Sequence, residues 1–289
     1  MSHKRFVVIN GDDFGLSSTV NHAIIEAHDR GILTSASLMV TGEAFNEAVA
    51  LAKTRPTLGV GLHLVLTCGQ SALPPDQISH LVDPAGQFSN RATLAGLHYQ
   101  FSRAARRELP LEIRAQLEKF RTTGLTLSHV DGHLHLHSHP IVLRYLVKLA
   151  DEFQIRVIRL PYEELRMNLA LDRSNLLDKI IRSFIFTPLR HYGKCLLKLH
   201  GIQFVDRVYG LLQSGRVTEN YLLSLIPQIQ ADFVEIYSHP EKAIPVESIV
   251  QSSGEAELKA LLSDRVSALL NQSGLTLTNY LDQHTRIFR

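Results

Sequence analysis

Cysteine is scarce in this sequence, and long apolar runs are missing. The chain of 289 residues carries two cysteines, Cys68 and Cys195, which form neither a CxxC pair nor a disulfide framework. This usage favours a reducing compartment. No stretch approaches the roughly 20 apolar residues that a transmembrane helix needs, and the apolar run at residues 6–9 is far too short for a signal peptide. We therefore expect a soluble, cytoplasmic protein without a transmembrane segment.

Strong charge and several common motifs are also lacking. The formal net charge is only +2, which gives no electrostatic reason to expect nucleic acid as a partner. There is no Walker loop, no GxGxxG fingerprint and no GxSxG elbow, and neither cysteine has a base at a motif spacing. The composition, 45% hydrophobic and 20% charged, is that of an ordinary globular protein with a sizeable core.

Strand and helix patterns alternate about eight times along the chain. Apolar runs of strand length occur at 5–10, 33–40, 58–66, 125–133, 154–160, 201–206, 232–240 and 275–280. Helical periodicity lies between most of them, at 17–31, 43–54, 110–124 (with Pro110 in the first turn), 140–150, 218–230 and 255–270. Such alternation indicates parallel strands joined by crossover helices. It predicts an α/β fold, a (β/α) barrel in a single domain that spans residues 1–289.

Two segments interrupt this alternation. Residues 67–108 are irregular and longer than an ordinary connection, so we expect a loop that covers a site or an unrecognised helix. Residues 162–200 are mainly helical and amphipathic, and 182–200 mix arginines and lysines with phenylalanines and leucines. Such a stretch could contact a lipid tail or a membrane surface. The plainer alternative is a helix that packs on the barrel with its lysines outward.

Residues 128–140, SHVDGHLHLHSHP, hold five histidines and one aspartate. In an extended strand successive side chains point to opposite faces, so one face would carry His129, Asp131, His133, His135, His137 and His139. Strand propensity does not favour imidazole, which points to metal binding or acid–base chemistry. A polar face toward solvent is the alternative. Spacing leaves open which histidines bind an ion, because His133/His135 and His135/His137 are both HxH pairs.

Reactive groups lie in or near the ends of five predicted strands. Asp12 and Asp13 follow the first, His63 lies in the third, and His133 and Arg159 are at the ends of the fourth and fifth. His239 follows the seventh. In a parallel barrel the carboxyl ends of the strands share one rim, where active sites form. One carboxylate and two imidazoles around a divalent ion would make a hydrolytic site. Asp12 and Asp13 face opposite ways in extended backbone, but from a turn one could bind the ion and the other accept a proton from water. The plain alternatives are a turn or helix cap for the aspartates, a core histidine for His63 and a surface strand end for Arg159.

At these residues the chain resembles the YdjC-like family of carbohydrate (chitooligosaccharide) deacetylases. The matching segments are VINGDDFGLS, GILTSASLMV, GVGLHLVLT, SHVDGHLHLHSHP and EIYSHP, in family order within residues 5–240. The resemblance implies a barrel-like fold that is often distorted, homodimers, and metal-dependent removal of the N-acetyl group from amino sugars. Carried over by motif, it implies Asp13, His63 and His133 as metal ligands, Asp12 as general base and His239 as general acid. His135 and His137 would then face the substrate or support the ligands, and Arg159 would orient Asp12.

The cofactor would be one divalent ion. Family precedent includes Mg²⁺, whereas a set of one aspartate and two histidines favours Zn²⁺. Two further segments, IRLPYEELR and GIQFVDRVYGLLQSGRVTENYLLSLI, resemble the branch associated with hopanoid biosynthesis. That likeness implies an N-acetylglucosaminyl hopanoid as substrate, with peripheral membrane contact. Two other functions stay open: another metal-dependent hydrolase, such as a phosphoesterase using an HxH pair, and a non-catalytic metal-binding protein.

Overall fold

A curved sheet of parallel strands forms the centre of the molecule. The computed structural model describes residues 4–243 and 252–283. In that part of the chain every strand pairing is parallel, in the order β4-β3-β2-β1-β6-β5, and β7 pairs with the first half of β1. The strands are β1 (Arg5–Phe14), β2 (Ser35–Leu38), β3 (Gly59–Leu64), β4 (Val130–Gly132), β5 (Arg207–Tyr209), β6 (Phe233–Ser238) and β7 (Leu275–Thr278). Since all pairings are parallel, their carboxyl ends share one edge, as predicted.

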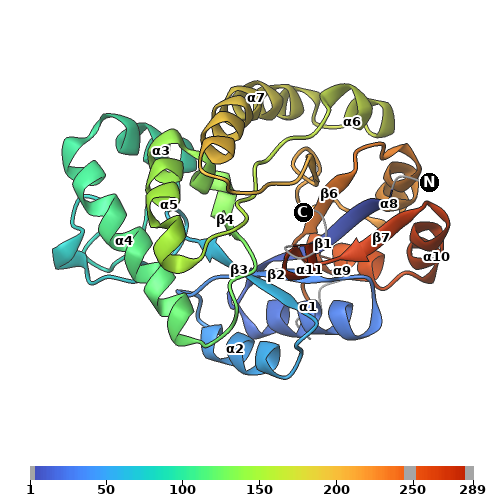
Figure 1. Ribbon diagram of the computed structural model, residues 1–289, viewed down its shortest axis with the longest axis horizontal. Coiled ribbons are helices and arrows are strands. Elements are labelled where there is room, and N and C mark those ends of the chain that lie inside the picture. Colours follow the sequence, from blue (N-terminus) through green and yellow to red (C-terminus); the bar gives the residue numbers. More distant parts are fainter. Residues whose placement is uncertain (1–3, 244–251, 284–289) are drawn as a thin grey trace.

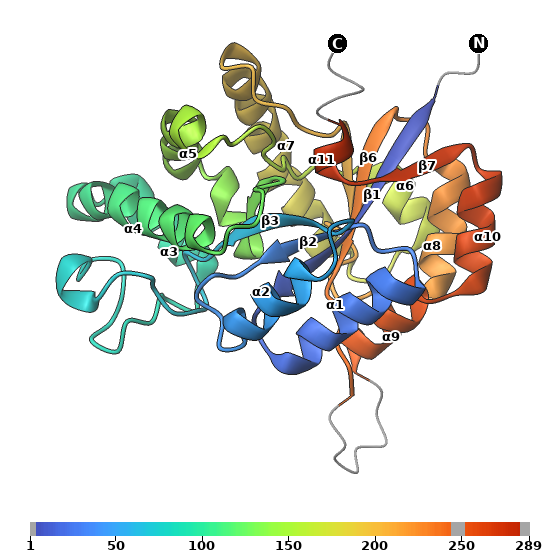
Figure 2. The same cartoon turned by 60° about the horizontal axis from the view of Figure 1, so that its bottom comes forward.

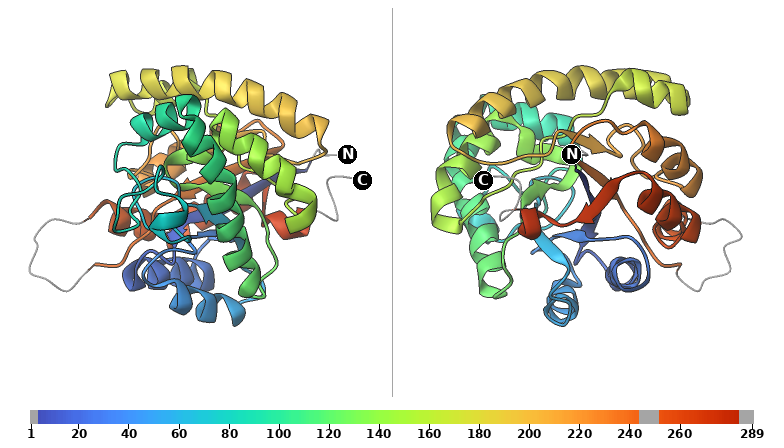
Figure 3. Two further views of the ribbon diagram at one scale, coloured as in Figure 1. Left: turned by 90° about the vertical axis from the view of Figure 1, so that its left-hand side faces the viewer. Right: turned by 45° about the vertical axis from the view of Figure 1, so that its right-hand side comes forward.

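Helices surround the strands (Figure 1), and the right-hand view of Figure 3 shows them as an arc around the sheet. They are α1 (Ser18–Arg30), α2 (Phe45–Lys53), α3 (Ala92–Phe101), α4 (Arg103–Thr122), α5 (Pro140–Phe153), α6 (Leu165–Leu171), α7 (Leu176–Leu199), α8 (Glu219–Leu225), α9 (Ser253–Leu261), α10 (Asp264–Gln272) and α11 (Tyr280–Gln283). Short 3₁₀ helices are η1 (Pro75–Gln77), η2 (His133–Ser138) and η3 (Ile226–Gln228). None of the described helices is both long and apolar enough to cross a membrane.

The helices form where capping and apolar spacing favour them. Ser17 caps α1 by accepting the backbone N–H of Val20, and the apolar positions of α1 are buried at the predicted helical spacing. Near the other end of the chain, a capping box formed by Ser252 and Glu255 starts α9. Helices α1 and α9 lie side by side (Figure 2), and the N–H of Ile32 donates to the carbonyl of Leu261. Helices from near the two ends of the sequence thus pack against each other.

The sheet is a half-barrel, so the predicted (β/α) barrel is confirmed as a barrel-like arrangement of parallel strands that does not close. The strands expected at 154–160 and 201–206 lie in the gap between β4 and β5, where they make only the isolated bridges Val130↔Ile158 and Val157↔Gln203. Within this segment the N–H of Arg159 donates to Val130, while that of Ile158 donates to Gln203. Each bridge joins a single pair of residues, so no continuous ladder forms on either side of the segment.

The histidine-rich segment also departs from its predicted form. Strand β4 ends at Gly132, and the chain turns into η2, where Leu134 and His135 have φ of 50° and 58°. Alternating faces require extended backbone, so the expected common face of titratable groups is absent. Beyond the end of β4, His133 contacts Asp13, whereas His135 and His137 point elsewhere.

Three helix boundaries differ from expectation. The irregular segment 67–108 contains α3 and the start of α4, which Ser102 caps. Pro110 lies inside α4 instead of in its first turn. A proline leaves the carbonyl four residues earlier without its helical donor, and here the hydroxyl of Tyr145 donates to that carbonyl, Arg106 O, at 2.9 Å. The helix expected at 255–270 is divided into α9 and α10 because Ser263 caps a new start. Helices α6 and α7 confirm the helical prediction for 162–200.

Replacement of Gly61 tests how tightly the inner face of the sheet is packed. A Cβ at Gly61 would lie 2.4 Å from the ring of His129, which hydrogen-bonds to Ser37 and Ser128. We expect Gly61→Ala to lower the free energy of unfolding by about 1–3 kcal/mol, as overpacking of a core does. Urea denaturation measures the change. The matched control is Gly96→Ala in α3, where the nearest atom would be 3.7 Å away; equal losses in both variants would contradict the packing argument.

Candidate active site

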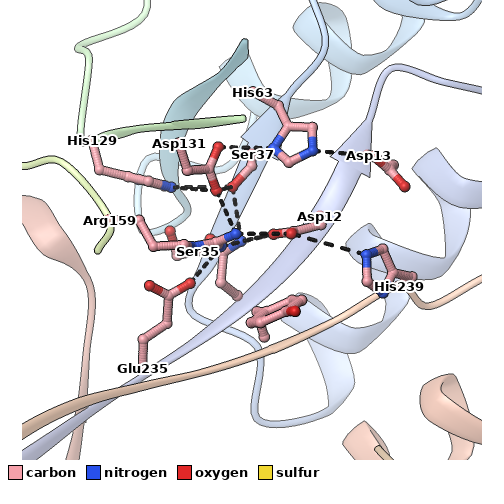
Figure 4. A network of polar contacts seen from close by, with 12 residues as sticks. Asp12, Asp13, Ser35, Ser37, His63, His129, Asp131, Arg159, Glu235 and His239 are labelled. Atoms are coloured by element: carbon pink, nitrogen blue, oxygen red, sulfur yellow. Dashed lines mark hydrogen bonds and ion pairs between the residues drawn. The ribbon is translucent and has the colours of Figure 1, made fainter. Parts of the chain in front are cut away.

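Asp12 and Asp13 end β1 on a distorted stretch of backbone. Asp13 has φ of 63°, and the register between β1 and β2 shifts between Gly11 and Phe14. This irregularity replaces the strict alternation of an extended strand, so both carboxylates contact groups at the carboxyl edge of the sheet (Figure 4). Both aspartates lie within β1, so the irregular strand end, and not the turn that the sequence suggested, brings the two carboxylates to the same edge.

The three expected ligands meet at one point. Asp13 Oδ1 lies 3.2 Å from His63 Nε2 and 2.9 Å from His133 Nδ1. One potential ligand atom from each residue lies within 4.8 Å of the other two. The His133 side chain is 18% exposed, so this cluster can be reached from solvent. One carboxylate oxygen and two imidazole nitrogens form a donor set that could hold a divalent ion.

Asp131 fixes the orientation of His63. The two residues are register partners on β3 and β4, and Asp131 Oδ1 lies 2.8 Å from His63 Nδ1. A carboxylate that accepts a hydrogen bond from one ring nitrogen leaves the other for an ion. A second set, Asp12, His63 and Asp131, also has ligand spacing. However, Arg159 pairs with both of its carboxylates, so the cluster with His133 is the better cation site.

The cluster is electrostatically polarised. Burial by itself would lower the pKa of His63, but the charge of Asp131 and hydrogen bonds to Asp13 and Asp131 raise this pKa to about 10. Burial would likewise raise the pKa of Asp13, but hydrogen bonds from His133 and His63 hold it well below its usual value. Without an ion, the proton on His63 therefore neutralises part of the carboxylate charge.

Arg159 is buried beneath the cluster and is not a surface strand end. Its two terminal nitrogens each lie 2.8 Å from one oxygen of Asp12, and Nη1 lies 2.8 Å from Asp131 Oδ2. Arg159 also donates to Glu235. Asn10 adds a hydrogen bond of 2.7 Å to Asp12 Oδ1. Burial would lower the pKa of Arg159, but these carboxylates raise it well above its usual value, so the guanidinium stays charged and holds Asp12 in place.

The remaining predicted residues lie in different surroundings. His239 follows β6 with its Nε2 4.0 Å from Asp12 Oδ2, and its side chain is 33% exposed. His135 Nε2 lies 2.9 Å from the hydroxyl of Tyr237. His137 is fully buried, and its Nε2 lies 2.9 Å from the carbonyl oxygen of Arg159. His135 is therefore at the cavity surface, while His137 supports the backbone behind it.

A cavity of about 430 Å³ opens over these groups. Its polar floor contains Asp12, His63, His133, His135, Tyr237 and His239. One wall comes from α7. It is mostly apolar, with Ile181, Ile185, Phe186 and Leu189, and it also carries the charged side chains of Asp178 and Arg182. Gly96 of α3 and Leu134 of η2 also line it. The irregular segment 67–108 thus contributes a helix to the cavity, and 162–200 contributes a wall.

Several residues of the network were not assigned from the sequence. Asp131 was noted only as part of the alternating stretch, and Asn10, Ser37, Glu235 and Tyr237 were not singled out. Glu235 and Tyr237 stand two apart on β6, which is the spacing that places both on one face. The two-residue alternation of a strand, counted back from the HP motif at the end of the strand, would have indicated Glu235 and Tyr237. Ser37 and Asn10 carried no comparable signal.

The fold and the site together define an α/β half-barrel with an aspartate–histidine cluster at the carboxyl edge of its sheet. The family model for YdjC-like proteins matches residues 6–272, and the chain belongs to this family. A carbohydrate deacetylase of Brevibacillus brevis is 46% identical over 54% of this chain and 59% of that protein. One of Geobacillus stearothermophilus is 38% identical over 71% of this chain and 74% of that protein. Neither comparison bears on the hopanoid-associated branch.

A solved structure shares the fold. It is that of an Enterococcus faecalis V583 protein with a provisional description as a cellobiose-phosphate cleavage protein. The identity is 25%, the TM-score is 0.74, and the match covers 96% of this chain and 98% of the other. This likeness extends over nearly the whole of both chains.

Binding of a divalent ion should release a proton from His63. Since the pKa of His63 is about 10 without an ion, Nε2 must lose its proton before it can coordinate. We expect zinc affinity to rise about tenfold per pH unit from pH 7 to about 9 on account of this group. In metal-free protein, the stability from the same raised pKa is fully present below about pH 6.5 and is lost as the pH rises through about 10. Calorimetry in buffers of different ionisation enthalpy measures the released proton.

His63→Gln should abolish this proton release and weaken binding. The matched control is His80→Gln, because His80 also pairs with a carboxylate, Glu108, but at the surface. A release that persists in His63→Gln, or one that disappears in His80→Gln, would contradict the assignment to His63.

Proposed function

We propose that the protein is a metal-dependent N-deacetylase that removes the acetyl group from an N-acetylated amino sugar. The observation that carries this proposal is the cluster of Asp13, His63 and His133, of which the two histidines line one open cavity together with Asp12 and His239. Relatives that are carbohydrate deacetylases support the reaction class and the substrate class.

The residues present fit a divalent ion. Two imidazole nitrogens converge on Asp13 Oδ1, and Asp131 occupies the remaining nitrogen of His63. Asp13, His63 and His133 would hold the ion, and their nitrogen-rich set favours Zn²⁺ over Mg²⁺. When bound, such an ion supplies Lewis acidity for the acetamide carbonyl and for a water molecule.

Asp12 and His239 would move the protons. Asp12 lies between Arg159 and the cavity and takes a proton from the attacking water. His239, across from it, donates a proton to the nitrogen of the departing amine, which is otherwise a poor leaving group. Arg159 and Asn10 keep the Asp12 carboxylate fixed during this exchange. The products are acetate and the free amino sugar.

His135 would contact the sugar, and His137 would act from behind. Burial, together with the nearby charge of Arg159, lowers the pKa of His135 well below its usual value. A neutral imidazole on the cavity wall suits hydrogen bonds to sugar hydroxyls. Burial also lowers the pKa of His137 to about 4, and its contact with the Arg159 carbonyl favours a positioning role.

Asp12→Asn tests the assignment of the general base. The amide keeps the shape of the side chain but cannot accept the proton, so we expect acetate release to fall by roughly 10²–10⁴-fold. Zinc content should stay at the wild-type level, because Asp12 is outside the ligand set. Acetate release from chitooligosaccharides and metal analysis measure the two effects. Asp29→Asn, at a surface ion pair with Arg55, is the control; full activity of Asp12→Asn would remove the base assignment.

A lipid-linked acetamido sugar, such as an N-acetylglucosaminyl hopanoid, is the substrate that we propose within this class. Beside the apolar cavity wall, α7 exposes further large apolar side chains, among them Leu177 at 72% and Phe184 at 82%. Leu134 at the cavity rim and Leu97 on α3 are also about half exposed. Exposed apolar side chains near a site can accept an apolar ligand, and here they would contact the aglycone while the sugar enters the polar floor.

Polar substitutions on α7 test whether the helix contacts the lipid part of a substrate, because they should affect activity on a lipid-linked sugar and not on a free one. We expect Leu177→Ser with Phe184→Ser to lower kcat/KM about tenfold for a lipid-linked N-acetylglucosamine, through lost apolar contact of ~1.4 kcal/mol or more. Activity on a soluble chitooligosaccharide should change less than twofold. Leu111→Ser, at a half-exposed leucine of α4, is the matched control. Equal losses on both substrates would refute the lipid contact.

Two other functions give different results in the same assays. A phosphoesterase would release phosphate from phosphate esters and no acetate from amino sugars. A non-catalytic metal-binding protein would release neither. The homodimer that the family resemblance implies and the cytoplasmic location expected from the sequence stay predictions.

A further inference from the structure

Glu257 is a buried carboxylate that the proposed reaction does not use. It lies on α9, is fully buried, and accepts two backbone N–H groups: that of Val217 at Oε1, 2.8 Å, and that of His239 at Oε2, 2.6 Å. The same Oε2 lies 3.9 Å from Nδ1 of the His239 ring. Glu257 therefore contacts both the backbone and the side chain of His239.

The ionisable partner of Glu257 is His239. In the described part of the chain, the ion pairs of Glu257 within 4.0 Å include no lysine or arginine, and His239 is its partner. Burial raises the pKa of Glu257, and the nearby His239 is the strongest influence that lowers it. A buried carboxylate without a strong cation is costly unless its surroundings compensate it. The arrangement thus favours a proton on the side of the ring that faces Glu257.

The His239 ring lies between two carboxylates. Its Nδ1 faces Glu257, and its Nε2 lies 4.0 Å from Asp12 Oδ2 at the cavity. The ring of Tyr237 packs edge-on against it at 5.6 Å, and Asp13 is close enough to interact with it through charge. Only Nε2 faces the cavity side where substrate would bind.

We propose that Glu257 is the positioning residue that keeps a proton on Nδ1 of His239, so that proton donation occurs from Nε2. This inference rests on the proposed function. Before donation, both ring nitrogens carry protons. The Nε2 proton passes to the nitrogen of the leaving amine as its bond to the acetyl carbon breaks, and the neutral ring retains the proton that faces Glu257. The proton that Asp12 took from water then returns to Nε2 and resets the ring.

Glu257→Gln tests the role through activity. The amide can still accept a backbone hydrogen bond but has no charge to hold the Nδ1 proton. We expect kcat for acetate release to fall about tenfold or more and the alkaline limb of the pH–kcat profile to move down by at least about half a pH unit, with KM within twofold. The matched control is Glu112→Gln, since Glu112 is also fully buried and accepts two backbone N–H groups, from Ala72 and Leu73. An unmoved alkaline limb in Glu257→Gln, or an equal shift in Glu112→Gln, overturns the proposal.

A spectroscopic readout keeps this test independent of activity and of the folding of the variant. In wild-type protein with ¹⁵N-labelled histidine and bound Zn²⁺, the His239 ring resonances are identified by their loss in His239→Gln. We expect Nδ1 to remain protonated from pH 6 to 9. A neutral ring with its proton on Nε2 overturns the proposal even if Glu257→Gln does not fold. Absence of acetate release by the wild type would refute the proposed function, whereas the resonances report on Glu257 itself.

Discussion

Arg159 is the cation around which the interior of the half-barrel is arranged. Its fully buried guanidinium contacts Asp12 from β1, Asp131 from β4 and Glu235 from β6. Removing one partner from a buried ion pair costs about 3–5 kcal/mol, because the other charge is left uncompensated. Three strands must therefore keep their positions relative to a single side chain. This requirement explains why residues 156–159 stay beside β4 with only isolated bridges to hold them.

The same network joins the candidate ligands to the candidate base. Asp131 contacts both His63 and Arg159, and Arg159 in turn contacts Asp12. A displacement of any one of these groups would change both the cation site and the proton acceptor. Glu257 on α9 extends this arrangement to His239 from outside the sheet. The polar interior is thus a scaffold of paired charges, while the adjoining α7 wall is mostly apolar, with Asp178 and Arg182 as its charged members. This contrast suits a substrate with a polar head and an apolar body.

Much of the fold and of the site followed from local patterns in the sequence. The helical spacing of α1, the buried run of β1 and the parallel order of strands depend on side chains close in sequence. The rim position of strand ends predicted that the reactive groups would converge at one edge, and the family resemblance selected Asp13, His63 and His133, which lie together in the structure. The strands at 154–160 and 201–206 could not be excluded in this way, because their apolar residues fit a strand. Their hydrogen bonds are divided among distant partners that no local pattern specifies.

The sequence by itself determined the alternation of elements, the shared edge of the strands and the reactive groups that follow their ends, because these depend on periodicity and on the geometry of parallel pairing. Only the tertiary structure decided which way each of those groups points. The positive φ values at Asp13 and His135 turn the backbone away from extended geometry. The buried Arg159 pairs with Asp12, whereas the neighbouring Asp13 contacts the histidines. Such choices depend on contacts between residues on different elements, up to 147 positions apart for Asp12 and Arg159, where charge and packing must be satisfied together.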